Sequence, residues 1–413
     1  MTAVAPAPPV RRNTALLSAA VAVQSAVLQL VAAISSLTFV LVTGIERLLG
    51  LGPAIFLTSA ALTALPAGRV MDRVGRVPVI ATGFMTGMAG TTLTALGART
   101  VSAPAVIVGF VLIGAASGMV LLARTAAGDM YPPERRARGI AWVLFGAVFG
   151  AILGPAVFSP IFAGRDLQPE ELAVPWLAAS GLLVVGLAFV LCVRPDPKRI
   201  AEQLGLAGER LAPGERAAPL SELIRRPGVV PALLAALASF AVMASVMNLT
   251  GYIVVEEHHH HQANVFPIIG AHVLGMYGLV LVVGNLIDRI GRTPALAGGL
   301  VVMGASCAGL TWAESVPATA ALLFGLGLGW NLSFVAATAQ LVDATRPHER
   351  GKLLGFSDLT AGLLAASLAL LGGVALEALG VAALAIGATV IALAPNLWIL
   401  RRGRRLAPVA RET

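Results

Sequence analysis

The sequence has few charged residues. Of its 413 residues 12% are charged and 57% are hydrophobic, whereas a soluble globular protein carries about 25% charged residues. That shortage argues against a water-soluble fold. Glycine is abundant, with 45 residues, and small residues let helices pack closely in lipid, where burial gives no driving force between them. The composition predicts a protein of the lipid bilayer.

Cysteine is also scarce. Cys192 and Cys307 both lie in apolar segments, so neither a disulfide framework nor a cysteine metal site is expected. The net charge of +8 comes from short basic clusters between apolar runs, without interleaved aromatic residues, which argues against nucleic-acid binding. Metalloprotease, P-loop and nucleophile-elbow motifs are missing. We therefore expect no enzyme activity and no bound cofactor.

Long apolar runs recur along the chain. A helix needs about 20 apolar residues to cross the hydrocarbon core. The first run is too long for a signal peptide and lacks a small-residue cleavage site, so we expect it to be the first span. The predicted spans lie near 14–42, 49–68, 78–98, 104–128, 138–163, 174–193, 229–255, 265–287, 295–312, 316–341, 353–374 and 380–399. The sequence thus predicts an all-α membrane protein with twelve transmembrane helices.

The basic residues predict the orientation of these helices. Lys and Arg concentrate in cytoplasmic loops of membrane proteins. Apart from Arg124 within the fourth predicted span, the loops on one side hold only Arg47, Arg99 and Arg165, and all other basic residues fall on the other side. This asymmetry places both termini in the cytoplasm.

A polar stretch divides the chain into two halves. Residues 194–228 are rich in Pro, Glu and Arg and fall between the sixth and seventh predicted spans. They predict a cytoplasmic linker between an N-terminal half, 1–193, and a C-terminal half, 229–400, which a tail at 401–413 follows. Within the linker, residues 220–226 suggest a short amphipathic helix on the membrane surface.

The two halves share an internal repeat. The segments from Gly68 to Pro78 and from Gly284 to Pro294 both fit G-x-x-x-D-R-x-G-R-x-P, after the second and eighth spans. A second pair, Asp129 to Arg136 and Asp343 to Arg350, follows the fourth and tenth spans. Matches in equivalent loops indicate a duplicated unit.

These loops resemble the signature loop of the major facilitator superfamily and its weaker second copy. The resemblance covers essentially the whole chain, and it implies the major facilitator fold of two six-helix pseudo-repeats. It also implies a monomeric secondary transporter in the cell membrane. Such a protein works by alternating access and moves a small molecule, with protons as the expected coupling ion.

The repeated loops are candidate gating elements. Gly68 and Gly75 allow tight turns and close approach of helix ends. Asp72 can accept hydrogen bonds from a helix N-terminus across the two halves, and Arg73 and Arg76 can pair with carboxylates or lipid phosphates. Alternatively, the arginines serve only as positive-inside anchors. The full set of candidates is Gly68, Asp72, Arg73, Gly75, Arg76, Gly284, Asp288, Arg289, Gly291 and Arg292.

The fifth predicted span carries Gly146, Gly150, Gly154 and Pro155. The glycines lie on one helix face, where they permit close packing, and the proline can kink the helix. The pattern resembles the antiporter motif of drug-efflux members, although Phe158 and Ser159 stand where that motif usually has two glycines. It implies export, with plain helix packing as the alternative.

An arginine that proton-coupled members usually carry in the fourth span is missing between Gly109 and Gly114. Arg124 lies further along that span, where it can serve differently or extend its side chain to the interface. The missing arginine argues against an ordinary proton relay.

Polar residues within spans are the candidates for substrate or proton binding, because such residues are costly in lipid. Asp358 is the clearest membrane carboxylate, unless it sits at the cytoplasmic interface, and His272 is either a titrating group or a satisfied core histidine. Trp330 offers an aromatic wall to a flat or cationic ligand. Uncharged candidates that can hydrogen-bond are Gln24, Gln29, Asn248 and Asn331.

Four histidines, His258, His259, His260 and His261, follow two glutamates at the outer end of the seventh span. They are candidate ligands for Zn, Ni or Cu, or sensors of external pH, unless they form an ordinary outer loop. The leading hypothesis is a proton-coupled exporter of hydrophobic or amphipathic compounds. The alternative is an uptake symporter, or a transporter of metals or metal chelates that uses the histidines.

Overall fold

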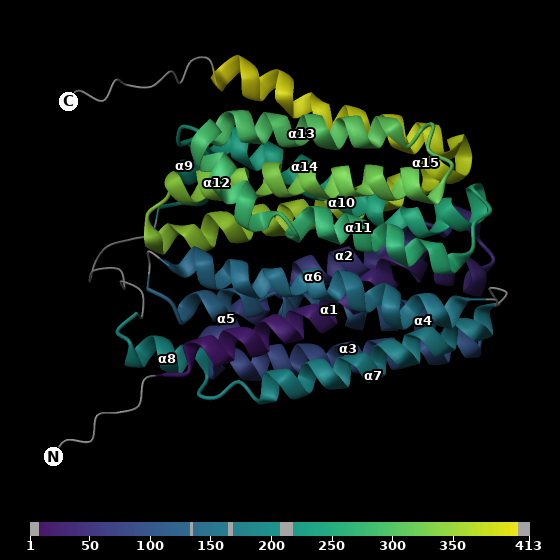
Figure 1. Cartoon of the computed structure of the whole chain (residues 1–413), viewed down its shortest axis with the longest axis horizontal. Coiled ribbons are helices and arrows are strands. Elements are labelled where there is room, and N and C mark those ends of the chain that lie inside the picture. The colour runs from purple at the N-terminus through teal and green to yellow at the C-terminus, as the bar shows by residue number, and fades with distance from the viewer. Residues whose placement is uncertain (1–7, 133–134, 164–167, 207–217, 404–413) are drawn as a thin grey trace. The chain divides into compact units, whose positions relative to one another are not determined.

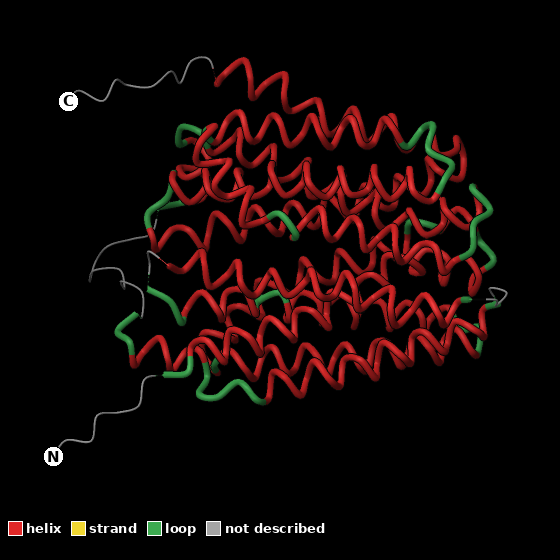
Figure 2. Tube along the Cα trace, in the orientation of Figure 1, coloured by secondary structure: helices red, strands yellow, loops and turns green. Residues whose placement is uncertain are grey.

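The computed structural model describes residues 8–132, 135–163, 168–206 and 218–403, and these residues contain helices and no strand (Figures 1 and 2). Each of the twelve predicted spans lies on one helix or on two consecutive helices. Parts of the predicted linker and tail, 207–217 and 404–413, lie outside the described residues, as does Arg165.

Seven helices precede the linker. The first and longest of them is α1 (Val10–Thr43). The fourth predicted span is divided at Leu121 and Leu122 into two helices, α4 and α5. The remaining bounds are α2 (Leu51–Val74), α3 (Arg76–Arg99), α4 (Ala103–Val120), α5 (Ala123–Asp129), α6 (Arg136–Phe162) and α7 (Ala173–Leu191).

The linker contains two short helices, α8 (Pro197–Gln203) and α9 (Leu220–Arg225). The helix predicted at residues 220–226 is therefore confirmed as an element. At the start of α8, the Asp196 side chain accepts a hydrogen bond from the Lys198 N–H over 2.8 Å, and Pro197 occupies the first turn. Both are favourable at a helix N-terminus.

The helices after the linker also include a predicted span that is divided between two helices. A π-helical turn, η4 (Ile253–Glu257), extends α10, and the eighth predicted span is divided between α11 and α12. In α15, Gly380 takes φ +78° and ψ −178° between the two last predicted spans, a conformation open to glycine. The bounds are α10 (Val229–Tyr252), α11 (Val265–Tyr277), α12 (Val280–Ile290), α13 (Arg292–Gly309), α14 (Val316–Asp343) and α15 (Pro347–Gly403).

Nine helices in the described part of the chain are long and apolar enough to cross a membrane, and a tenth counts if the bent pair around α11 and α12 forms one span. The predicted span at 295–312 falls on α13, and those at 353–374 and 380–399 share α15. Length and apolarity thus support a multi-pass membrane protein.

The chain forms two compact units. Unit 1 comprises residues 1–31, 41–44 and 55–208, and unit 2 comprises residues 32–40, 45–54 and 209–413. Unit 2 therefore includes a part of α1 and the start of α2, which simple division at the linker assigns to the other half. In unit 1, α3 packs against α4 and α7, while in unit 2 α14 packs against α10, α11 and α13.

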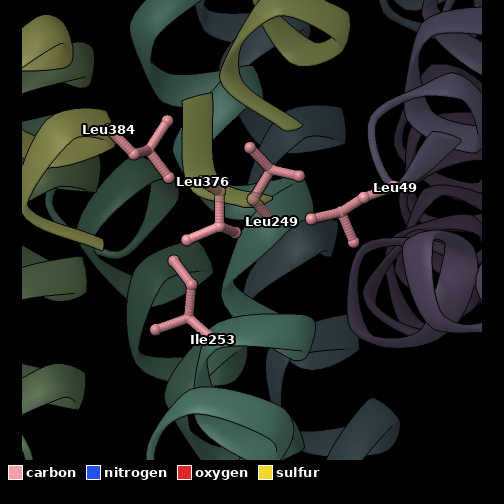
Figure 3. Close-up of a cluster of buried hydrophobic side chains, with 5 residues drawn as sticks. All are labelled: Leu49, Leu249, Ile253, Leu376 and Leu384. Carbon is pink, nitrogen blue, oxygen red and sulfur yellow. The ribbon is translucent and has the colours of Figure 1, made fainter. Parts of the chain in front are cut away.

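The interior of unit 2 includes a purely aliphatic cluster (Figure 3). Its members come from the segment before α2, from α10 with η4, and from both sides of Gly380 in α15. The residues are Leu49, Leu249, Ile253, Leu376 and Leu384, all at most 7% exposed. Tyr252 and Val381 pack against it. The cluster ties the turn of α15 to α10.

Candidate functional site

The repeated loop of unit 1 is organised around one arginine. Arg76, the first residue of α3, places its guanidinium 2.6 Å from Asp72 Oδ1 and 2.7 Å from Asp129 Oδ2. Its side chain is 13% exposed, whereas that of Asp72 is 71% exposed. Arg76 therefore joins the end of α2, the start of α3 and the end of α5 through charge-assisted hydrogen bonds.

Unit 2 repeats this arrangement. Arg292, at the start of α13, lies 2.7 Å from Asp288 Oδ1 and 3.3 Å from Asp343 Oδ2. In each unit, the two repeated motifs are separate along the chain but meet in one ion network. Arg73 and Arg289, the other arginines of the shared motif, are exposed.

The second glycine of each loop makes the turn. Gly75 has φ +108° and Gly291 has φ +89°, conformations that side chains other than glycine rarely adopt. The first glycine behaves differently, because Gly68 lies within α2 and Gly284 within α12, with open space where a Cβ would stand. The prediction of a tight turn and close approach at Gly68 is therefore wrong, since α2 continues to Val74.

The glycine face of α6 packs against α1. A Cβ at Gly146 would meet the Ser18 carbonyl, and one at Gly150 would lie 2.5 Å from the Ala22 carbonyl oxygen. At Gly154 the nearest atom is the Gln29 side-chain nitrogen, 2.6 Å away. The glycines are thus sites of close helix contact in unit 1, on the helix that also contains Pro155.

Three of the uncharged polar candidates are buried. Gln29 is buried and its side-chain nitrogen donates to the Gly150 carbonyl over 2.5 Å. Asn248 is buried on α10 and donates to the Ala244 carbonyl over 2.7 Å. Gln24 is 7% exposed on α1. Of these three side chains, that of Gln29 is shown to bond to another helix, α6.

His272 is fully buried on α11. Its Nδ1 lies 2.8 Å from the Leu323 carbonyl oxygen, and because a carbonyl only accepts, Nδ1 carries the hydrogen. Its Nε2 is buried without a hydrogen-bond partner among the described residues. The imidazole therefore fixes α11 to α14 and leaves one acceptor unsatisfied.

Trp330 lies in an aromatic cluster of unit 2. Its ring stacks on Phe334 with centroids 4.9 Å apart and planes at 13°, and Tyr277 meets it edge-on at 5.9 Å. Phe240 lies 6.1 Å from Phe334. We call these four residues, from α10, α11 and α14, the aromatic cluster. Trp330 is 7% exposed and the other three are half-buried.

Trp330 and the residue that follows it in the sequence carry polar atoms without hydrogen-bond partners in the described part of the chain. Trp330 Nε1 and both amide atoms of the adjacent Asn331 are buried with no hydrogen-bond partner among the described residues. Asn331 is fully buried. Leaving such groups unpaired costs about 1–3 kcal/mol each, so they call for a ligand, a water or a second conformation.

Asp358 is exposed on α15. It lies about 16 Å along the helix from the start at Pro347, at the usual helical rise. That distance places it well beyond the first turn. Asp358 therefore lies inside a helix, whereas Asp72, Asp129, Asp288 and Asp343 lie in the last turn of their helices.

The outer histidines lie beside a pocket of about 370 Å3 in unit 2. His260 Nε2 is 2.7 Å from the Glu314 carbonyl oxygen, and the His258 and His260 rings meet edge-on at 6.4 Å. Burial, followed by the nearby His260, lowers the pKa of His258 below its usual 6.5. The pocket is lined by Glu257, His258, His259, Leu310, Thr311, Ala313, Glu314 and Val381.

A metal site at these histidines is not supported by their arrangement. Among the described residues, no three His, Cys, Asp or Glu side chains converge on a position that could hold a metal ion. His260 Nε2 is directed to the Glu314 backbone carbonyl instead. The metal site predicted at His258, His259, His260 and His261 therefore finds no support in the geometry of the described residues.

The sequence did not identify several residues of these sites. Phe334 follows Trp330 by four residues, which places both on one helix face, so this pair was detectable. Tyr277 and Phe240 lie on other helices, and nothing in the sequence joins them to Trp330. The same holds for the linker residue Asp196, which contacts a loop 120 residues away.

Comparisons with known proteins agree with this architecture. A family model described as "Major Facilitator Superfamily" matches residues 14–284 and 232–412. The chain is 30% identical to an uncharacterised transporter, YdeG, of Bacillus subtilis over 80% of this chain and 77% of that one. It is also 30% identical to the riboflavin transporter RfnT of Brucella anthropi, over 84% of this chain and 85% of that one.

A solved structure shows the same fold. The inward-open xylose transporter XylE from E. coli superposes with a TM-score of 0.74 over 98% of both chains, at 12% identity. That identity supports the fold alone. With the helices, the duplicated loops and the relatives in agreement, the chain belongs to the major facilitator superfamily of membrane transporters.

Proposed function

We propose that this transporter exports flat, uncharged, amphipathic molecules in exchange for protons. The aromatic cluster is the observation that carries the proposal. Stacked and edge-on rings bind planar ligands through their faces. The described interior of unit 2 contains one buried carboxylate, Glu349, which Arg226 binds. An aromatic wall without a free buried charge suits neutral cargo.

The unpaired polar atoms of Trp330 and the adjacent Asn331 narrow the proposed substrate class. Trp330 Nε1 can donate one hydrogen bond, and the Asn331 amide can both donate and accept. A ring with polar edges would satisfy groups that the protein leaves unpaired. Riboflavin, which the relative's name mentions, is a flat heteroaromatic molecule of this kind. The proposed substrate class therefore combines a planar ring with hydrogen-bonding edges.

Proton coupling is assigned to Asp358. It is the one acidic residue within any of the twelve predicted spans, and ionisable groups in membrane segments are typically functional. A carboxylate that takes up a proton on one side and releases it on the other needs no further cofactor. Export is supported by the resemblance of the Gly146 to Pro155 segment to the antiporter motif.

The test uses riboflavin as a fluorescent probe of stacking on Trp330. In purified protein we expect Trp330→Ala to weaken riboflavin binding by about tenfold or more, as loss of a stacking partner implies. Trp330→Phe keeps a ring beside Phe334 and should bind more tightly than Trp330→Ala. The control is Trp312→Phe, because Trp312 is 81% exposed and lies outside the cluster.

Equal affinity of wild type and Trp330→Ala for riboflavin and for a panel of planar drugs would contradict the assignment of the aromatic cluster. Equal weakening by Trp312→Phe would show that the effect is not specific to the cluster. Binding of xylose with the same dependence on Trp330 would contradict the preference for planar cargo.

A further inference from the structure

One linker carboxylate caps two helices at once. Asp196 Oδ1 accepts from the Lys198 N–H over 2.8 Å at the start of α8. The same oxygen accepts from the Arg76 N–H over 3.1 Å, and Oδ2 accepts from the Val77 N–H over 2.8 Å. Arg76 and Val77 begin α3, where backbone N–H groups have no helical partner. A carboxylate is the favoured group at such a position.

The loop is shaped to admit this carboxylate. A Cβ on Gly75 would lie 3.0 Å from Asp196 Oδ2, closer than side-chain contacts usually are. Gly75 therefore serves two requirements, a positive φ of +108° and space for the carboxylate. The tight turn and the cap depend on each other.

Lys198 holds the other side of the same loop. Its ammonium donates to the Asp72 carbonyl over 2.7 Å and to the Arg73 carbonyl over 3.3 Å, at the end of α2. Cations are favourable at a helix C-terminus. Asp196 and Lys198, two residues apart, thus bind the carbonyls that end α2 and the amides that begin α3. We call this pair the linker clasp.

The N-terminal helix fixes the chain just before the clasp. Arg12 donates to the Arg194 carbonyl, and Asn13 donates to the Pro195 carbonyl over 3.0 Å. Asn13 is fully buried. The clasp is therefore attached to α1 and is not a loose surface contact.

The second repeat has the ion network without the clasp. Arg292 pairs with Asp288 and Asp343 as Arg76 pairs with Asp72 and Asp129. In the described part of the chain, the side-chain hydrogen bonds of Arg292 come from its guanidinium, whereas Arg76 also donates its backbone N–H to Asp196. The linker begins at the end of the first half and contacts the gating loop of that half. The two gating loops are therefore held by different contacts.

The geometry points to Asp196 and Lys198 as positioning residues that set the conformation of the first gating loop and thereby the rate of its conformational change. This inference rests on the proposed gating role of that loop. Arg76 carries both the backbone N–H that Asp196 binds and the guanidinium that bridges Asp72 and Asp129. Releasing the clasp therefore loosens the ion network, while the aromatic cluster, in the other unit, is left intact.

The experiment measures hydrogen exchange and transport in full-length Asp196→Ala, Asp196→Asn and Lys198→Ala. Exchange in the peptide covering residues 70–80 should become about fivefold faster in Asp196→Ala, as loss of a helix cap implies. It should stay unchanged in the peptide covering 286–296. Asp196→Asn keeps an acceptor oxygen and should restore much of the protection. Glu202→Ala, an exposed residue of α8, is the charge-matched control.

Transport completes the test in proteoliposomes, with riboflavin as the probe. We expect the clasp variants to change the maximal rate severalfold while the riboflavin dissociation constant stays unchanged. Unchanged exchange in Asp196→Ala would overturn the clasp itself. Faster exchange with an unchanged rate, or a parallel loss of binding, would overturn the positioning role. Because exchange is measured without substrate, failure of the substrate assignment would remain distinguishable from failure of the clasp.

Discussion

At the residue scale, a partly buried ion pair joins the end of the linker to the start of α15 in unit 2. Arg226 donates to Glu349 from both terminal nitrogens, Nη1 and Nη2, over 2.6 and 2.9 Å, and Nη1 also donates to the Ala344 carbonyl. Glu349 is 2% exposed and accepts from the Arg346 N–H as well. Removing the arginine would take a bidentate hydrogen-bond donor and its charge away from a buried carboxylate.

The first prediction follows from this pair. Arg226→Ala should lower the melting temperature of the detergent-purified protein, because desolvated Glu349 loses its bidentate partner. The neighbouring Arg225, the last residue of α9, is exposed, so Arg225→Ala removes the same charge one residue away and should leave the melting temperature nearly unchanged. Equal melting temperatures for both variants would contradict a structural role of the pair.

His258 supports a prediction on pH. Burial and the neighbouring His260 lower its pKa, while Glu314 and Glu257 oppose the shift and His259 adds to it. Because the pKa in the folded protein is below the unfolded value of about 6.5, the unfolded chain binds the proton first. The stabilisation from neutral His258 is present above that pH and is lost as the pH falls through the lowered pKa.

We therefore expect the melting temperature to fall between pH 7.5 and pH 5.5, and His258→Gln to reduce that fall. His261 is exposed outside the pocket, so His261→Gln is the matched control and should leave the pH dependence as in wild type. An identical pH profile for wild type and His258→Gln would contradict the role of burial at this histidine.

At the element scale, the contact between α1 and α6 depends on the absence of side chains. Besides the glycine contacts, Ser25 donates to the Ala147 carbonyl over 3.2 Å and Gln29 to the Gly150 carbonyl. The helices therefore exchange side-chain to backbone hydrogen bonds across a glycine surface, which is how polar groups are satisfied between membrane helices. A methyl group on that surface has no space.

The third prediction concerns this surface. Gly150→Ala should lower the melting temperature and the yield of monodisperse protein, because the new Cβ would lie 2.5 Å from the Ala22 carbonyl oxygen. Gly181→Ala in α7 is the control, since nothing lies within 4 Å of its Cβ position and alanine favours a helix more than glycine does. Tolerance of both changes would contradict close packing of α1 on α6.

The glycine spacing in α6 indicated one packing face, but not which helix it contacts. Helical periodicity places Gly146, Gly150 and Gly154 together, whereas a sequence holds no signal for a partner that lies more than 100 residues away. The division of the fourth span at Leu121 and Leu122 was equally hidden, because residues 118–123 are all apolar. Span positions, by contrast, follow from hydrophobic length alone.

At the scale of the whole molecule, the duplicated loops show what a sequence reveals and what it does not. The matched motifs identified Asp72 and Arg76 with Asp288 and Arg292 as equivalent residues. The motifs did not show that Arg76 also binds Asp129, 53 residues away, because equivalence along a chain is not proximity. The aromatic cluster and the linker clasp depend on tertiary contacts in the same way.

Proton-coupled export of planar molecules is the central claim, and one measurement tests it most directly. Inside-out vesicles containing the transporter are energised so that the lumen is acidic, and a pH-sensitive dye reports the gradient when riboflavin is added. We predict proton release from the lumen with the wild type and none with Asp358→Asn, while Trp330→Ala responds only at higher riboflavin concentration. Acidification of the lumen on adding riboflavin would indicate symport, and silence of the wild type across riboflavin and planar drugs would contradict the account.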